Sequence, residues 1–182
     1  MGIKLITGAA APLTAAALRA HCSIAPDDTS FDGLLTDYIA AASGLIEEMT
    51  GRAFGAQTWL LGLDAFPAEI VLPRGPVTGV TWVKYFDASG AEQVLDSNQY
   101  LVDLISDPQR IVLAPDAEWP VTQVRANAVT VQFATGYAEL PPAITQAIRA
   151  TVAAWFATRE TAELPRGVIN ALAPYVSQWV FA

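Results

Sequence analysis

Residues 30–52 read SFDGLLTDYIAAASGLIEEMTGR and carry the clearest structural signal in the chain. Apolar side chains recur within this stretch at steps of three and four, and polar side chains fall between them, as in an amphipathic helix. Asp28 or Ser30 can accept hydrogen bonds from the first free backbone N–H groups, and Gly51 can take the left-handed conformation that ends a helix. The sequence therefore predicts a helix over 30–51 with both ends encoded locally.

Three shorter stretches also carry helical signals. The first covers 14–22, where Thr14 is the expected N-cap. Pro142 suits the first turn of a helix over 143–160, because proline lacks the N–H group that this turn leaves without a partner. A last short helix is expected over 168–173.

Between the helices, apolar residues alternate with polar ones, which is the period of a half-buried strand. Segments rich in Gly, Pro, Asp and Asn separate these runs, and Gly90 can take the positive φ that the clearest hairpin needs. Runs joined by short turns predict an antiparallel meander. The expected strands are 3–7, 57–63, 69–72, 77–86, 93–95, 100–103, 110–113 and 129–134.

Helices at both ends of the chain with strands between them predict an α+β fold. We expect a single domain over 1–182, in which the N- and C-terminal helices pack as a small bundle with an antiparallel β-meander inserted at about 57–134. An almost wholly apolar tail, 175–182, follows the last helix.

The composition is apolar for a protein of 182 residues, with 53% hydrophobic and 15% charged residues. Such a chain is expected to cover part of its surface with another chain. The formal net charge is −8, and the ten basic residues never cluster along the sequence, which argues against a site that grips nucleic acid. An acidic protein can still lie beside DNA if its task is to let the duplex pass without binding it.

Reactive side chains are few. His21 and Cys22 are adjacent in an expected helix, which points them about 100° apart and disfavours a nucleophile–base pair. A single cysteine excludes an internal disulfide and a paired-cysteine metal site, and the pair Asp27-Asp28 has no third metal ligand nearby. No common catalytic or nucleotide-binding motif occurs. We expect no enzyme activity, no metal and no cofactor, and no apolar run is long enough to span a membrane.

Two groups of apolar residues leave alternatives open. The tryptophans could line a sugar-binding face or belong to the core and subunit contacts. The tail could fold back onto its own helices or dock into another protein, since burying each large apolar side chain is worth about 1.5–3 kcal/mol. The tryptophans are Trp59, Trp82, Trp119, Trp155 and Trp179, and the candidate docking residues of the tail are Tyr175, Val176, Trp179, Val180 and Phe181.

A set of short motifs, taken in their order along nearly the whole chain, resembles the head–tail connector (adaptor) family of long-tailed phages and gene transfer agents. The motifs are Pro12-Leu13-Thr14 with Leu18 and His21, Asp27-Asp28, Thr50-Gly51-Arg52, Gln57-Thr58-Trp59, Phe66-Pro67, Leu72-Pro73-Arg74, Ala128-Val129-Thr130-Val131, Gly136-Tyr137, Leu140-Pro141-Pro142-Ala143-Ile144 and Leu172-Ala173-Pro174-Tyr175.

This resemblance implies a non-enzymatic structural protein that forms a ring of about a dozen copies beneath the portal, with a heterologous contact between neighbours. The ring would extend the channel for passing double-stranded DNA and present a docking surface for stopper or tail-terminator proteins. The apolar tail would bind the portal protein. The protein would reside in the host cytoplasm during assembly and then at the head–tail interface of the particle, with no membrane partner.

Two other functions remain open from the sequence. A tail-completion or tail-terminator protein would bind a tail tube in place of a portal. A carbohydrate-binding or hydrolytic accessory protein would use the tryptophans or the scattered carboxylates.

Overall fold

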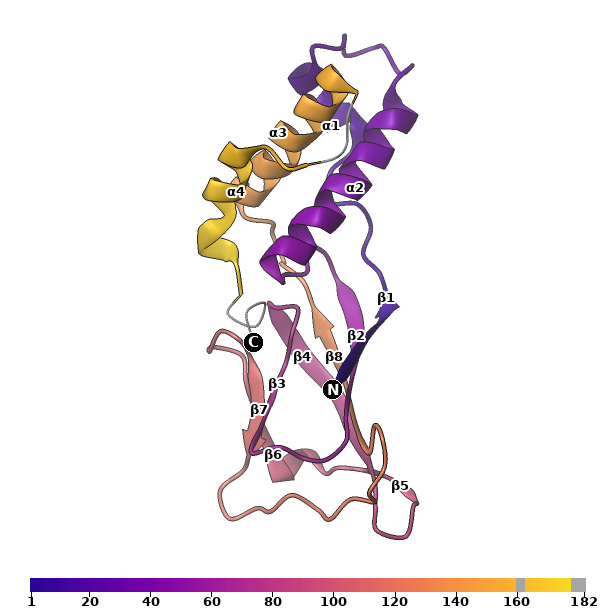
Figure 1. Cartoon of the computed structure of the whole chain (residues 1–182), viewed down its shortest axis with the longest axis vertical. Helices are drawn as coiled ribbons and strands as arrows, with labels where there is room; N and C mark the ends of the chain where they lie inside the picture. The colour runs from indigo at the N-terminus through magenta and orange to yellow at the C-terminus, as the bar shows by residue number, and fades with distance from the viewer. Residues whose placement is uncertain (160–162, 178–182) are drawn as a thin grey trace.

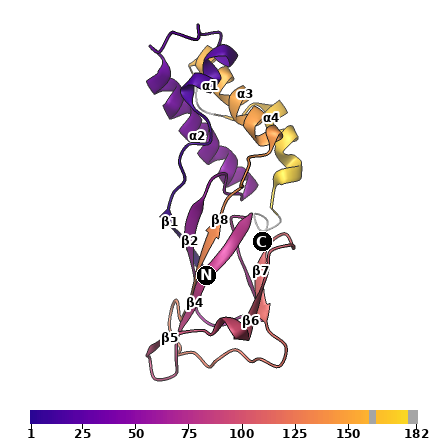
Figure 2. The same ribbon diagram turned by 180° about the vertical axis from the view of Figure 1, so that it is seen from behind.

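The computed structural model describes residues 1–159 and 163–177. The described chain is elongated, with the helices at one end and two antiparallel sheets at the other (Figures 1 and 2). The architecture is α+β, with mixed helices and antiparallel sheets as the sequence predicts.

The helical end is built around α2 (Asp32–Thr50) and α3 (Pro142–Thr158). Helix α1 (Ala15–Arg19) continues into a 3-10 turn over Ala20–Cys22, and α4 (Arg166–Leu172) continues into another over Ala173–Tyr175. All four helices contribute to one apolar cluster, because the recurring apolar residues of each point inward. Its fully buried members include Leu18, Leu35, Ile39, Ile46, Ile144, Ile148, Val152 and Leu172.

The N-terminus of α2 differs from the expectation. The helix begins at Asp32 with Phe31 in the N-cap position, and no side chain caps it. The Asp28 carboxylate instead accepts from the Ser30 backbone N–H, at 2.9 Å, and from the Ser30 hydroxyl. Asp28 therefore closes a local turn one residue before the cap, and the prediction that Asp28 or Ser30 caps the helix is wrong.

Other local signals appear at their expected positions. Thr14 Oγ1 accepts from the Ala17 N–H at 3.4 Å at the start of α1, and Gly51 ends α2 with φ of 65°. Gly90 has φ of 86° in the hairpin after β4. Pro142 is the first residue of α3, which ends at Thr158, two residues short of the expected end.

The strands form two sheets in place of one meander. A five-stranded sheet has the order β1-β2-β8-β4-β5, and a three-stranded sheet has the order β3-β7-β6. Every pairing is antiparallel. The strands are β1 (Gly2–Thr7), β2 (Gln57–Leu63), β3 (Glu69–Val71), β4 (Val77–Phe86), β5 (Glu92–Val94), β6 (Tyr100–Asp103), β7 (Arg110–Leu113) and β8 (Val129–Thr135).

Strand β8 lies between β2 and β4, and its alternate residues Val129, Val131 and Phe133 are fully buried on one face of the larger sheet. These side chains meet Ile70 and Ile111 of the smaller sheet in a second apolar cluster. The molecule thus has one core among the helices and another between the sheets. The meander prediction fails because it assumed that sequence neighbours pair.

The two ends of the molecule are joined where the chain leaves α2 and where it enters α3. Gly136 has φ of 125°, and a Cβ built on it would lie 2.2 Å from the Gly55 carbonyl oxygen. A side chain at position 136 would therefore collide with the backbone that leads from α2 into β2.

Candidate functional site

Within residues 1–159 and 163–177, the one histidine and the one cysteine form no nucleophile–base pair. His21 is exposed on the 3-10 turn after α1, and burial raises the pKa of the adjacent Cys22 thiol, which disfavours the nucleophilic thiolate. Among the residues that the structure describes, no three His, Cys, Asp or Glu side chains come together to hold a metal ion.

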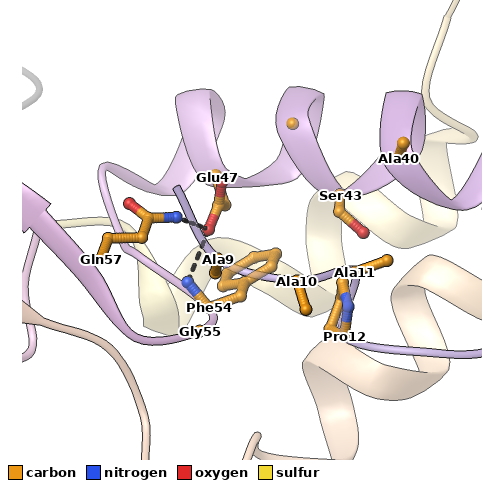
Figure 3. Close-up of a pocket in the computed structure, with 11 residues that line it drawn as sticks. Ala9, Ala10, Ala11, Pro12, Ala40, Ser43, Glu47, Phe54, Gly55 and Gln57 are labelled. Carbon is orange, nitrogen blue, oxygen red and sulfur yellow. Dashed lines mark hydrogen bonds between the residues drawn. The ribbon is translucent and has the colours of Figure 1, made fainter. Parts of the chain in front are cut away.

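A pocket of about 180 Å³ lies between α2, the segment Ala9–Pro12 and the loop that leads into β2 (Figure 3). Glu47 is the one titratable group among the described residues that line it. Burial raises the pKa of this carboxyl, and its Oε1 accepts from the Phe54 N–H at 2.6 Å and from Gln57 Nε2 at 2.9 Å. The arrangement fastens the start of β2 to α2, and no second acid or base lies in the lining to support catalysis.

The prominent surface feature is a set of exposed apolar side chains. Soluble monomers expose single apolar residues commonly, but groups of them mark surfaces that bind a partner. In the described part of the chain, two adjacent pairs are exposed, Leu5 with Ile6 on β1 and Leu104 with Ile105 in the turn between β6 and β7. Exposed apolar residues also occur singly at Val94, Leu101, Val121 and Val124.

The β6–β7 turn presents its apolar residues on an ordered backbone. The Asp103 carboxylate accepts from the Ile105 and Ser106 N–H groups, both at 3.0 Å, and from the Ser106 hydroxyl at 2.6 Å. The Ser106 side chain and these N–H groups hold the pKa of Asp103 well below its usual value. Ile105 is 97% exposed on this fixed turn, so binding a partner there would order little additional chain.

Arg52 connects this turn to the C-terminal segment. Its side chain is buried and forms a two-pronged pair with the Asp107 carboxylate, and its Nε donates to the Tyr175 carbonyl oxygen at 3.0 Å. The Ser177 N–H donates to the Thr50 carbonyl oxygen at 2.8 Å. The base of the apolar tail is therefore held at the C-terminal end of α2, beside the β6–β7 turn.

The sequence-predicted tail residues divide between the described and undescribed parts of the chain. Tyr175 and Val176 are half-buried, and Tyr175 packs against the helical core. Trp179, Val180 and Phe181 lie outside the described residues. Sequence reasoning missed Leu104, Ile105 and the role of Arg52. An apolar pair beside the Ser-Asp-Pro turn was the available signal for the first two.

The four described tryptophans are engaged within the chain. Trp155 is buried and donates to the Glu163 carbonyl oxygen at 3.0 Å, and the Trp119 ring stacks on Phe66 with centroids 4.7 Å apart. The half-buried Trp59 and Trp82 rings lie beneath the cations of Arg74 and Lys84. Rings held in this way do not offer a row of open faces for sugar binding, which disfavours the carbohydrate-binding alternative.

The basic side chains are dispersed and several are neutralised locally. Arg19, Arg52, Arg74, Lys84 and Arg110 each pair with a carboxylate. This distribution supplies no concentrated positive surface for phosphate groups. None of the described helices is both long enough and apolar enough to cross a bilayer.

The fold is an α+β chain with helices at one end and two antiparallel sheets at the other. No protein-family model matches the sequence, and no curated protein matches it. Solved structures do match. A chain in the neck of an empty GTA particle, computed with C6 symmetry, superposes with a TM-score of 0.80 at 23% identity, covering 97% of this chain and 96% of that chain.

Two further solved structures give the same result. A chain in the virion of a native gene transfer agent particle has a TM-score of 0.78 at 23% identity, covering 97% of this chain and 95% of that one. A chain in the neck of a native GTA particle, computed with C12 symmetry, has a TM-score of 0.67 at 24% identity, covering 96% and 95%. At these identities the comparisons establish a shared fold over nearly the whole length.

Proposed function

We propose that this chain is a structural head–tail connector that forms a ring beneath a portal, extends the DNA channel and offers a docking surface to a stopper or tail-terminator protein. The observation that carries the proposal is the likeness in fold, over nearly the full length of both chains, to components of gene transfer agent particles and their necks. The proposal assigns no catalytic step to the protein.

The exposed apolar groups support a role in assembly. A ring member must cover two different flanks with its neighbours and must also contact the proteins above and below it. The exposed apolar residues on β1 and on the β6–β7 turn lie at separate places on an elongated molecule (Figure 1). Separate contact surfaces of this kind suit a protein with several partners better than a protein with one ligand pocket.

The electrostatics support a channel that does not hold DNA. The chain carries 18 acidic and 10 basic residues, and several of the cations are paired with carboxylates. An acidic lumen repels phosphate groups, so that packaged duplex can slide past it.

The tail is the proposed portal anchor. Arg52 and Thr50 hold the backbone of Tyr175 and Ser177, which gives the following residues a fixed starting point beside the β6–β7 turn. Trp179, Val180 and Phe181 would then insert into an apolar site on the portal, with Tyr175, Val176 and the turn lining the entrance.

The ring is tested by light scattering and electron microscopy of the purified chain, alone and mixed with its portal protein. We expect closed rings of about a dozen copies in at least one of these samples. A chain that stays monomeric at high concentration and has no affinity for the portal would overturn the proposal.

The tail is tested by replacing Trp179, Val180 and Phe181 with serine in the full-length chain. This triple variant should fold and form rings but lose co-purification with the portal. The matched control, Gln178→Ser, changes a neighbouring polar residue and should bind the portal as the wild type does. Portal binding by the triple variant at the wild-type level would refute the anchor and leave the ring untouched.

A further inference from the structure

We propose that neighbouring copies of this chain join by strand addition, with β1 of one copy pairing along the open edge of β4 in the next copy. The inference rests on the proposed function for the existence of the ring, and it identifies the surface that connects the copies.

The first open edge is β1, at one side of the five-stranded sheet. Among the described strands, β1 pairs only with β2, and five of its six residues are exposed. Leu5 and Ile6 are 43% and 49% exposed, although both are large and apolar. An apolar edge strand with unpaired backbone groups is a template on which another strand can form hydrogen bonds.

The second open edge is the first part of β4, at the other side of the same sheet (Figure 1). Strand β5 pairs only with Lys84–Phe86, and the Leu95 N–H donates to the Val83 carbonyl oxygen. Within the described residues, no strand pairs with the outer edge of β4 from Val77 to Trp82. Thr78 and Thr81 are exposed on this edge.

The two edges match in length and direction. Each spans six residues, Gly2–Thr7 and 77–82. The pairings β1 with β2, β2 with β8 and β8 with β4 are all antiparallel, so β1 and β4 run in opposite directions. If the symmetry axis of the ring runs parallel to the strands, rotating one copy onto the next does not change the direction of its strands. In a ring with such an axis, β1 of one copy therefore meets β4 of the next in an antiparallel sense.

The charges on the two edges permit this contact. The chain carries a net charge of −8, so most surfaces of two copies repel each other. Neither edge contains Asp or Glu, and Lys4 is the one charged residue on them. The contact joins two different surfaces, the opposite edges of the larger sheet, and is therefore heterologous, the type of contact from which closed rings are built.

Two features of these edges restrict which strand can pair. A charged residue on an edge strand discourages indiscriminate pairing, and Lys4 is such a residue on β1. Irregularities in an edge strand have the same effect, and β4 has two, between Val77 and Gly79 and between Val80 and Trp82. A neighbour's strand can pair there only in a register that accommodates these irregularities.

Disulfide cross-linking tests the contact directly. In a Cys22→Ser background, Ile6→Cys is combined with Thr78→Cys, and a second double variant combines Ile6→Cys with Thr81→Cys to detect a shifted register. Within one copy, β1 and β4 are three strand spacings apart, about 14 Å, which is too far for a disulfide to form. Gentle oxidation of assembled rings should therefore give a ladder of covalent multimers on a non-reducing gel.

The single-cysteine variants are the matched controls, because one thiol per chain can link no more than two copies.

As a second readout, Leu5→Glu should abolish the ring while the circular dichroism spectrum stays unchanged. Ile169→Glu, at a position on α4 with the same 43% exposure, should keep the ring. Rings that form normally but give no product larger than a dimer in either double-cysteine variant would overturn strand addition and leave the connector proposal intact. Absence of rings under all conditions would overturn both.

Discussion

Arg52 shows how a single residue connects parts of the chain that are distant in sequence. It follows the helix-ending Gly51, so its side chain emerges where α2 meets the sheets. The guanidinium has acceptors in Asp107 and Tyr175, which lie in the β6–β7 turn and in the C-terminal segment. A buried guanidinium is tolerated because these acceptors replace its lost hydration.

Replacing Arg52 with alanine should destabilise the fold by about 1–3 kcal/mol, because the Tyr175 carbonyl and the half-exposed Asp107 lose a charged donor. Urea unfolding measures this loss, and limited proteolysis should cut sooner after α4. The control Glu92→Gln breaks an exposed pair with Lys84 and should stay within about 0.5 kcal/mol of the wild type. Equal stability of Arg52→Ala and the control would contradict the role of Arg52.

A pH dependence follows from Asp87 in the hairpin after β4. Hydrogen bonds from the Ser89 hydroxyl, the Gln93 side chain and the Ala91 and Ser89 N–H groups lower its pKa from 3.8 to about 2. Because the unfolded chain binds the proton first, the stability that Asp87 contributes is present above pH 3.8 and is lost as the pH falls through about 2. Asp87→Asn should therefore be less stable than the wild type at pH 7.

Urea midpoints of the two proteins at pH 7, 4 and 2 measure the effect, and the difference between them should shrink mostly between pH 4 and 2. A difference that stays constant over this range would contradict the assignment.

The effect of pH on the stability that Glu47 contributes has the opposite sign, because burial raises the pKa of Glu47. Its contribution is greatest below the usual glutamate value and declines as the pH rises through the raised pKa.

Helix α2 is the element whose pattern predicts its packing most directly. Ile46 is fully buried in the helical core, and the adjacent Leu45, which points about 100° away around the helix, is 44% exposed. Ile46→Ala should cost about 2–5 kcal/mol through lost burial and the cavity left behind. Leu45→Ala should cost less than about 1 kcal/mol, and similar losses in the two variants would show that the helix faces are assigned wrongly.

The sequence predicts individual elements better than it predicts their neighbours. Alternation of Val129, Val131 and Phe133 with more polar or smaller residues defines β8 as a strand, because alternation is a local property. The insertion of β8 between β2 and β4 depends on pairing across more than forty residues, which no local pattern reports. The start of α2 was missed for a related reason, since Asp28 can close a turn as readily as it can cap a helix.

The candidate contact residues were partly predictable. The apolar tail is visible in the sequence because six of its eight residues are apolar, and chain ends are usually polar. The exposure of Leu5 and Ile105 was not predictable, because a Leu or Ile in a strand or beside a turn is buried more often than exposed. The open edge of β4 also requires the strand order, which became known only from the structure.

At the scale of the whole molecule, net charge opposes assembly. Each copy carries a formal charge of −8, so added salt should weaken the repulsion between copies and strengthen the ring. Sedimentation at about 0.05 M and 0.5 M salt should show a larger fraction of rings at the higher concentration, since the Debye length falls severalfold. A ring that dissociates as salt is added would indicate that charge pairs between copies dominate the contact.

The segment from β8 through α3 has a consequence for synthesis of the protein. It supplies both the central strand of the larger sheet and a main helix of the other core, yet it occupies residues 129–158. The ribosome therefore synthesises most of the polypeptide before either hydrophobic core can form. Nascent chains that stall earlier would expose the apolar faces of β2, β4 and α2, so we expect premature stalling to favour aggregation unless chaperones cover these faces.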